Sequence, residues 1–266
     1  MGRSLKYEIP GDDPRVSPDE IASSGFGRLF ARARARAGAP RRGAEVDRAG
    51  IAGMATLTEM ADLTDRPERV DPEAPGDTPP RRLVLEIGFG RGEFLLALAE
   101  AAPDTDFVGI EVSWKRALKM ARKVARAHLP NVLLTVGRGE EALRDAFAPG
   151  SLSALWVNFS DPWPKLRHAE RRLVKPSFAA LAARALAPGG TLYVATDDVP
   201  YAQQIDEVLS AEKGLVNRYA PLAFLPEVPG RMRTGYEAQW RAESRPLHFF
   251  AYAAPVDPAR GGEGMR

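Results

Sequence analysis

From Arg82 onward, the sequence alternates between short, unbroken apolar runs and longer segments with helical character. The apolar runs, which predict β-strands, are Leu83–Ile87, Phe107–Ile110, Val132–Val136, Leu152–Val157, Thr191–Ala195 and Leu247–Ala253. The helices predicted between them are Gly92–Ala101, Ser113–Ala127, Glu140–Phe147, Pro176–Leu186 and Pro200–Ser210. Strands that alternate with helices form a mainly parallel sheet with helices on both faces. Unbroken apolar strands are typical of a sheet that is covered on both faces.

The first part of the chain has a different composition. Residues 1–80 are rich in Arg, Ala, Gly, Pro and Asp, and residues 66–80 resemble a linker. Few large apolar side chains are available there for a core, so we expect a partly disordered extension, with at most a short helix within residues 44–64. The expected domains are this extension, one folded domain over residues 81–257, and a flexible tail over residues 258–266.

Composition excludes several classes of protein. The 266 residues contain no cysteine, which excludes disulfides, thiolate zinc sites and cysteine nucleophiles. No apolar run approaches the ~18 residues of a membrane span, and the first residues lack the apolar region of a secretory signal. His128 and His248 are isolated from other ligand types, so neither predicts a metal site. We therefore expect a cytoplasmic protein, monomeric or homodimeric, with no metal and no membrane partner.

A glycine-rich turn joins the first predicted strand to the first predicted helix, with glycines at 88, 90 and 92. Such glycines allow a tight turn and a close approach of the backbone to a ligand. The dinucleotide-binding pattern requires a third glycine at position 93, where this chain has Glu93. A glutamate there would repel a pyrophosphate. The turn therefore suits a ligand without phosphate and with a positive centre, such as S-adenosylmethionine, which Glu86 could attract.

Glu111 ends the second predicted strand. A carboxylate at this position can accept hydrogen bonds from both hydroxyls of a ribose, in a methyltransferase or in a dehydrogenase. Glu111 thus indicates nucleoside binding without choosing the cofactor.

The segment from Asn158 to Lys165 follows the fourth predicted strand and contains Pro162 and Pro164. Two prolines restrict φ and remove two backbone donors, which favours a stiff, extended loop. This loop presents Asp161 and the Trp163 ring at the carboxyl edge of the sheet, where open α/β folds bind ligands. A flat ring beside a carboxylate suits a nucleobase, whereas the structural alternative is a turn with the tryptophan packed in the core.

The net charge is only +2, but the arginines cluster in Arg28–Arg42 and in Lys165–Lys175. Local basic patches are typical of phosphate binding, although most basic runs are solvated faces. We expect Arg28–Arg42 to be a weak electrostatic arm, or else disordered. Arg171 and Arg172 lie in the second of these runs.

Four motifs then occur in order: EIGFGRG at 86–92, NFSDPWPKLRH at 158–168, ATDDVPYA at 195–202 and RTGYE at 233–237. Over about 82–255 the chain resembles the tRNA (guanine-N7-)-methyltransferase family. The resemblance implies a Rossmann-like class I methyltransferase fold, with a mostly parallel seven-stranded sheet and helices on both faces. It also implies that S-adenosyl-L-methionine is the methyl donor, that tRNA is the partner, and that the methyl group goes to N7 of guanine at position 46 of the variable loop.

Carried over to this sequence, the resemblance implies a catalytic role for Asp161. The cofactor-binding positions are Glu86, Gly88, Gly90, Gly92, Glu111 and Arg138. The substrate-binding positions are Lys165, Asp197, Thr234, Tyr236 and Glu237, to which the basic run adds Arg171 and Arg172.

The chain departs from the family pattern at three places. Arg138 stands where an Asp or Asn is usual, so its backbone is expected to serve the adenine in place of that side chain. Ser160 replaces a common proline, which loosens the loop, and Leu166 replaces a frequent lysine, which removes a phosphate contact.

Three alternatives stay open at this point. The first is a class I methyltransferase acting on another RNA base or on a small molecule. The second is a nicotinamide dehydrogenase with a similar sheet, and the third is a non-catalytic RNA-binding module, in which the acids would have no use.

Overall fold

The computed structural model describes residues 8–38 and 81–256. The predicted linker at 66–80, the possible helix within 44–64 and the tail at 258–266 lie outside these residues.

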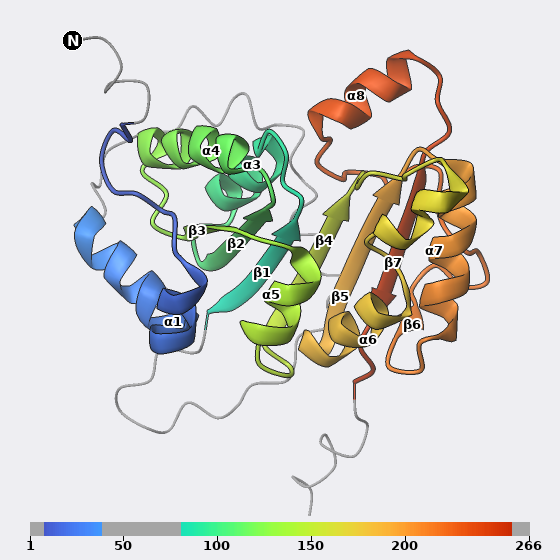
Figure 1. Ribbon diagram of the computed structural model, residues 1–266, viewed down its shortest axis with the longest axis horizontal. Coiled ribbons are helices and arrows are strands. Elements are labelled where there is room, and N and C mark those ends of the chain that lie inside the picture. The colour runs from blue at the N-terminus through green and yellow to red at the C-terminus, as the bar shows by residue number, and fades with distance from the viewer. Residues whose placement is uncertain (1–7, 39–80, 257–266) are drawn as a thin grey trace, which may run out of the picture.

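A seven-stranded sheet forms the centre of the protein (Figure 1), in the order β3-β2-β1-β4-β5-β7-β6. The strands are β1 Arg82–Ile87, β2 Thr105–Glu111, β3 Val132–Val136, β4 Leu152–Asn158, β5 Leu186–Thr196, β6 Val216–Asn217 and β7 His248–Ala253. The first five strands are parallel, and β7 runs antiparallel to both β5 and β6. The predicted mostly parallel, seven-stranded sheet is confirmed.

Helices pack on both faces of the sheet, because the apolar side chains of each strand alternate between two cores. In β1, Leu85 and Ile87 join one core and Val84 joins the other. The first core is completed by the helices α5 Gly139–Asp145, α6 Pro176–Ala185 and α7 Val199–Ala211. The second core is completed by α3 Glu93–Ala101 and α4 Trp114–Ala127.

Within residues 81–256, two strands and one α-helix differ from the sequence prediction. The structure begins β5 at Leu186 because this residue already pairs with Leu152, before the irregularity at the proline and glycines that follow it. The sequence did not predict β6, which has only two residues, or the helix α8 Gly235–Ala242. In Figure 1, α8 lies above the edge of the sheet at which β4 and β5 end.

The N-terminal helix α1 Pro18–Ala37 is part of the folded domain. Ser17 caps it in a capping box with Glu20, and the chain kinks at Gly25. Just before α1, the backbone forms a parallel bridge to β3 between Arg15 and Leu134.

The prediction of a flexible arm at Arg28–Arg42 is therefore wrong for residues 28–37. Leu29 and Phe30 are buried in the first core, and the Phe26 ring stacks on Phe147 of the main domain at 4.8 Å. These apolar contacts fix a helix whose other side chains are mostly basic or small. Residues 39–42 lie outside the described residues.

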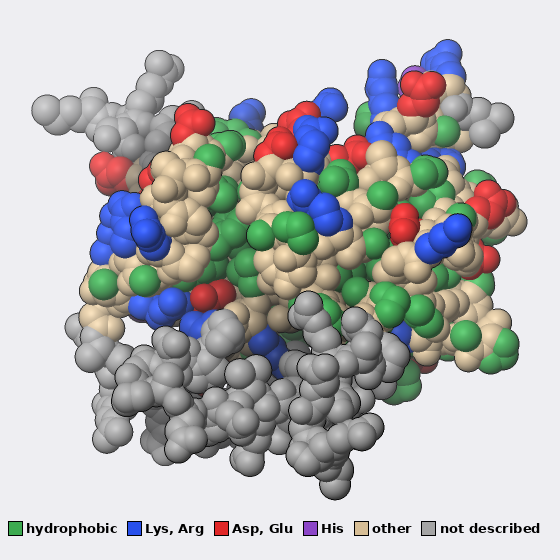
Figure 2. Space-filling view, turned by 90° about the horizontal axis from the view of Figure 1, so that it is seen from below, with side chains coloured by type: hydrophobic (Ala, Val, Ile, Leu, Met, Phe, Trp, Pro, Cys, Tyr) green, Lys and Arg blue, Asp and Glu red, His purple; other side chains and the backbone are tan. Residues whose placement is uncertain are grey.

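The edge at which the parallel strands begin shows mixed charge. Seen from below in Figure 2, acidic and basic side chains are interspersed with apolar ones. Asp106, near the start of β2, binds Arg34 of α1 at 2.8 Å and Arg81 at 2.9 Å. The Arg34–Asp106 ion pair holds α1 against the sheet, at the edge opposite the candidate site.

Candidate functional site

The predicted site residues lie at the edge where β1, β4 and β5 end (Figure 1). Glu86 is near the end of β1, Asn158 ends β4 and Thr196 ends β5. In doubly wound sheets, ligands bind outside these carboxyl ends.

The glycine turn after β1 has the backbone that the sequence predicted, with positive φ angles at Gly88, Gly90 and Gly92. The Gly90 N–H donates to Glu111 Oε2 at 3.0 Å, and the Ser113 N–H donates to Glu111 Oε1 at 3.0 Å. Glu111 is buried at the end of β2. It therefore holds the turn in shape at the place where a ribose-binding acid was predicted.

Replacing Gly92 with alanine is expected to lower the free energy of unfolding by about 2–4 kcal/mol. The residue has φ +73°, and an added Cβ would lie 2.1 Å from Met120 Sδ. Gly150→Ala is a matched control, because Gly150 has φ +68° and nothing lies within 4 Å of its Cβ position. Chemical denaturation should show a clearly smaller decrease for this control. Equal decreases would mean that close packing on α4 does not require the glycine.

Glu86 is a buried acid of the site. It is 2% exposed, and Asn158 Nδ2 donates to its Oε1 at 3.1 Å. Among the described residues, its Oε2 has no hydrogen-bond partner. Burial raises the pKa of Glu86 to about 7, against the opposing effects of Asn158 and Arg231. A buried carboxylate oxygen without a partner fits a cationic donor such as the ammonium group of S-adenosylmethionine.

The loop after β4 is conformationally strained. Phe159 and Trp163 have φ angles of 52° and 43°, which bulky side chains rarely adopt. Asp161 is exposed, and its Oδ1 accepts a hydrogen bond from the Trp163 N–H at 3.0 Å. Strain of this kind concentrates at functional sites, where the surrounding structure holds it in place.

Arg172 holds this loop from inside the protein. Its Nε donates to the Pro162 carbonyl at 2.7 Å, and its Nη1 donates to Gln204 Oε1 of α7 at 2.6 Å. Its guanidinium also lies 5.2 Å from the centre of the Tyr201 ring. Arg172 is only 5% exposed, so the prediction that it contacts RNA phosphates is wrong. Its contact with the Pro162 carbonyl supports the Asp161 loop.

Two basic side chains that follow the loop, Lys165 and Arg171, are exposed. Lys165 precedes the 3₁₀ helix Leu166–Arg171, and Arg171 lies 4.9 Å from the centre of the Trp163 ring. The His168 ring meets the same indole edge-on, with centroids 5.8 Å apart. These groups form a basic and aromatic surface beside Asp161.

The C-terminal motif forms the start of α8. Thr234 is its N-cap and accepts a hydrogen bond from the Glu237 N–H at 3.0 Å. Glu237 is 1% exposed, with one carboxylate oxygen bound to Arg231 and the other to Arg241. Tyr236 is 39% exposed. Of the three predicted substrate residues, Thr234 and Glu237 thus stabilise the helix, whereas Tyr236 faces outward.

The start of α8 lies against the glycine turn. Arg91 lies 5.3 Å from the centre of the Tyr236 ring. A Cβ added to Gly235 would come within 2.4 Å of Arg91 Nη2 and 2.5 Å of Glu93 Oε2. Because Trp240 of α8 also meets the Phe159 ring at 4.7 Å, α8 joins the glycine turn to the Asp161 loop.

The remaining predicted residues lie at the rim. Asp197, just after β5, forms an ion pair with Arg245 at 3.0 Å, and Arg245 lies over the Trp240 ring of α8. Arg138 precedes α5 and is exposed. All four motifs therefore meet at one edge of the sheet.

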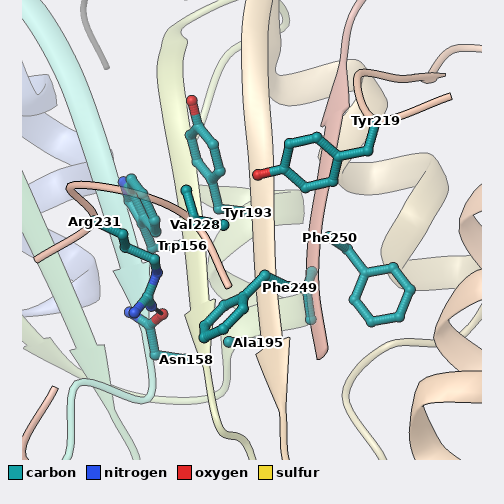
Figure 3. A pocket seen from close by; sticks show the side chains of 10 residues that line it. Trp156, Asn158, Tyr193, Ala195, Tyr219, Val228, Arg231, Phe249 and Phe250 are labelled. Atoms are coloured by element: carbon teal, nitrogen blue, oxygen red, sulfur yellow. Dashed lines mark hydrogen bonds between the residues drawn. The ribbon is translucent and has the colours of Figure 1, made fainter. Parts of the chain in front are cut away.

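An aromatic pocket adjoins the site (Figure 3). The rings of Trp156 and Tyr193 stack there with centroids 4.0 Å apart. Burial raises the pKa of Tyr219 to about 12. In Figure 3, the Arg231 guanidinium points toward Asn158. Sequence reasoning assigned no role to Asn158 or Arg231. Asn158 is the first residue of the second motif, whereas Arg231 has no sequence signal of its own.

Metal-binding clusters and membrane spans are both absent from the described ranges, 8–38 and 81–256. These residues contain no group of three or more His, Asp or Glu that could hold a metal ion. They also contain no helix with the length and apolar character that crossing a membrane requires.

Comparison with known proteins decides the family. A family model described as "Putative methyltransferase" matches residues 80–250. Among curated proteins, the tRNA (guanine-N(7)-)-methyltransferase of Geobacter metallireducens is 34% identical over 66% of this chain and 84% of its own length. The chain belongs to the tRNA (guanine-N7-)-methyltransferase family.

Other proteins with the family's name are similar to this chain. That of Streptomyces coelicolor is 42% identical over 60% of this chain, which covers 59% of the relative's length. That of Leifsonia xyli is 43% identical over 61% of this chain and 70% of its own length. These matches confirm the family that the four motifs predicted.

Solved structures are also similar to this member of the family. The antibiotic-resistance methyltransferase Kmr is 20% identical, with a TM-score of 0.45 over 66% of this chain and 88% of that chain. An rRNA methylase from Streptococcus thermophilus is 14% identical, with a TM-score of 0.44 over 66% of this chain and 87% of that chain.

Proposed function

We propose that this protein transfers the methyl group of S-adenosyl-L-methionine to N7 of a guanine in tRNA, at position 46 of the variable loop. The observation that carries the proposal is the convergence at one sheet edge of three features. These are a buried acid with an unpartnered oxygen, a strained loop that carries Asp161, and the helix α8. The product is N7-methylguanosine in tRNA, and the proposed site of action is the cytoplasm, where tRNA is used.

The cofactor-binding residues bind and orient S-adenosyl-L-methionine. The Glu86 oxygen that has no partner accepts a hydrogen bond from the ammonium group of the donor. Glu111, beside the turn, accepts hydrogen bonds from the ribose hydroxyls. The positive φ angles at Gly88, Gly90 and Gly92 bring the backbone close to the ligand. The backbone at Arg138 serves the adenine.

S-adenosyl-L-methionine supplies a methyl group on a sulfonium: the N7 lone pair forms the new C–N bond, and the C–S bond electrons return to sulfur. N7 needs no deprotonation for this attack, so the protein acts mostly by positioning. Asp161 accepts hydrogen bonds from the guanine N1–H and the N2 amino group. Its charge stabilises the positive charge that develops on the purine.

Some of the substrate-binding residues contact tRNA directly in this proposal, and the others stabilise α8. Lys165 and Arg171 contact the tRNA backbone, and the exposed Tyr236 ring meets a base. Thr234 and Glu237 act by holding α8 in place, and Asp197 acts through Arg245, which packs on α8.

Transfer of label from S-adenosylmethionine to bulk unmodified tRNA, with mapping of the modified nucleotide by mass spectrometry, tests the proposal. We expect N7-methylguanosine in the variable loop. A methyl group on another base, or label in rRNA and not in tRNA, would support the rival methyltransferase activities. Stabilisation by NAD and not by S-adenosylhomocysteine in a thermal shift assay would support a dehydrogenase.

The exposed basic surface is expected to set the salt dependence of tRNA binding. Replacing Lys165, Arg167 and Arg171 together with alanine should weaken binding. It should also reduce the slope of log K against log salt by about one for each phosphate that the variant no longer neutralises. Arg144→Ala removes a similarly exposed arginine from α5 and serves as the control. An unchanged slope in the triple variant would show that this surface does not contact tRNA.

A further inference from the structure

Arg231 is a buried cation at the centre of the candidate site. It is 9% exposed, and its guanidinium carbon lies 4.8 Å from the ring centre of Phe249, 5.4 Å from that of Phe94 and 5.9 Å from that of Trp156. These rings come from β7, α3 and β4. Aromatic faces attract a cation, and the attraction is stronger where water is excluded. The rings therefore hold the guanidinium in a defined place.

The guanidinium fork is bound at both ends. Nη1 donates to Glu237 Oε2, and Nη2 donates to Asn158 Oδ1. The amide of Asn158 in turn donates through Nδ2 to Glu86 Oε1 at 3.1 Å. Figure 3 shows the step from Arg231 to Asn158. A continuous chain of hydrogen bonds thus runs from Glu86 to α8.

The two ends of this chain of hydrogen bonds have different roles in the proposed function. Glu86 is the acid that receives the cofactor, whereas Glu237 anchors the helix that presents Tyr236 to the substrate. Arg241 extends this chain of hydrogen bonds along α8, because its Nη2 donates to Glu237 Oε1 at 3.1 Å. A planar fork can bridge two partners in fixed geometry, which a lysine ammonium cannot do in the same way.

We infer that Arg231 is a positioning residue that couples the cofactor pocket to the substrate-facing helix α8. The inference rests on the proposed function, because it assigns the two ends of the hydrogen-bond chain to cofactor and tRNA. Arg231 acts through Asn158 and Glu237 and touches neither reacting group.

The charge of Arg231 has its own consequence for the cofactor. The charged groups that act on Glu86 are Arg231, which favours its ionised form, and Glu111, which opposes it, while Asn158 donates a hydrogen bond to it. Only the ionised form of Glu86 attracts a cationic donor. Removing the charge at 231 raises the pKa of Glu86 further. Cofactor binding then requires a higher pH.

The two-ended hydrogen bonding of Arg231 has a second consequence: it couples the binding of the cofactor to the binding of tRNA. If cofactor binding fixes Glu86 and Asn158, it also fixes Arg231 and, through Glu237, the start of α8. tRNA then meets a helix already in place, so each ligand strengthens the binding of the other by the same factor. Couplings of this kind typically amount to about 5- to 150-fold.

The variants Arg231→Met and Arg231→Lys separate the effect of the charge on Glu86 from the coupling between cofactor and tRNA binding. Methionine keeps an apolar side chain in the aromatic cage but removes the charge, whereas lysine keeps the charge but lacks the fork. Arg233→Met is the matched control, because Arg233 lies on the same loop and its side chain is 60% exposed. Each full-length variant is titrated with S-adenosylhomocysteine from pH 5.5 to 9, with and without unmodified tRNA, and its thermal unfolding is recorded.

In wild type, we expect tRNA to raise the affinity for S-adenosylhomocysteine at least about fivefold. Arg231→Met should move the pH midpoint of binding upward. Below that midpoint its affinity should fall about tenfold for each pH unit by which the midpoint has risen, and it should recover at high pH. Arg231→Lys should keep the wild-type midpoint but lose the coupling to tRNA. Arg233→Met should keep both.

A wild-type midpoint in Arg231→Met, or wild-type coupling in Arg231→Lys, would overturn the inference and leave the proposed function standing. A wild-type protein that binds neither S-adenosylhomocysteine nor tRNA would instead contradict the proposed function itself. Recovery of binding at high pH distinguishes a charge effect from a folding defect, because a misfolded variant would not recover.

Discussion

Replacing Asp161 with alanine is expected to lower kcat for methyl transfer by about 100- to 1,000-fold, with little change in S-adenosylhomocysteine affinity. The side chain lies at the tip of the strained loop after β4, apart from the buried residues Glu86 and Glu111. In the proposed mechanism, its charge stabilises the positive charge that develops on the purine. Single-turnover kinetics with saturating cofactor measure the effect.

Asp161→Asn separates the charge of this residue from its structural role. The aspartate Oδ1 accepts a hydrogen bond from the Trp163 N–H, which an asparagine oxygen can also accept. We expect the asparagine variant to be nearly as slow as the alanine variant. Asp145→Ala, which removes an exposed acid from α5, should keep full activity. An asparagine variant with wild-type kcat would show that Asp161 only shapes the loop.

Replacing Glu86 with glutamine is expected to stabilise the ligand-free protein and to weaken its cofactor binding. Burial raises the pKa of Glu86 from 4.5 to about 7, so the ionised side chain destabilises the fold. This rise in pKa corresponds to a penalty on the order of 3 kcal/mol above pH 7. Loss of the charged partner should weaken S-adenosylhomocysteine binding by about 10- to 100-fold at pH 8.

The stability gained by Glu86→Gln over wild type is expected to increase with pH. Below pH 4.5 the carboxyl is protonated in both the folded and the unfolded protein, so the glutamine variant gains nothing. Between pH 4.5 and 7 the unfolded chain releases the proton while the folded protein keeps it, and the advantage of glutamine grows. Above pH 7 it levels off. Denaturant unfolding of both proteins across this range measures the difference.

Glu100→Gln is the control for this prediction, because it changes an exposed glutamate on α3. It should alter neither stability nor cofactor binding. Equal stability of wild type and Glu86→Gln at pH 8 would contradict the burial of an ionised acid at the end of β1.

The sequence predicted the local features of the site well. The glycine turn and Glu111 could be located because strand ends and tight turns follow from short runs of residues. Gly88 needs its positive φ whatever packs around it. The prolines located the loop with Asp161, but its predicted extended backbone is wrong at Phe159 and Trp163, which have positive φ angles.

The features that sequence reasoning missed depend on tertiary contacts. Arg172 and Arg231 are arginines like their exposed neighbours Arg171 and Arg233, and only the fold shows which of them are buried. The helix α1 was hidden for a similar reason, since only three buried apolar residues, Ile21, Leu29 and Phe30, anchor a segment rich in arginine. Periodicity alone does not reveal such anchors.

The central claim is that N7 of one guanine attacks the methyl group of S-adenosyl-L-methionine, whose ammonium group Glu86 binds, without removal of a proton. A tRNA with 7-deazaguanosine at position 46 of the variable loop tests this claim directly, because it replaces the attacking nitrogen by a C–H group. We predict that this tRNA binds as tightly as unmodified tRNA and accepts no methyl group. Methyl transfer to the 7-deaza tRNA at the rate of unmodified tRNA would contradict the claim.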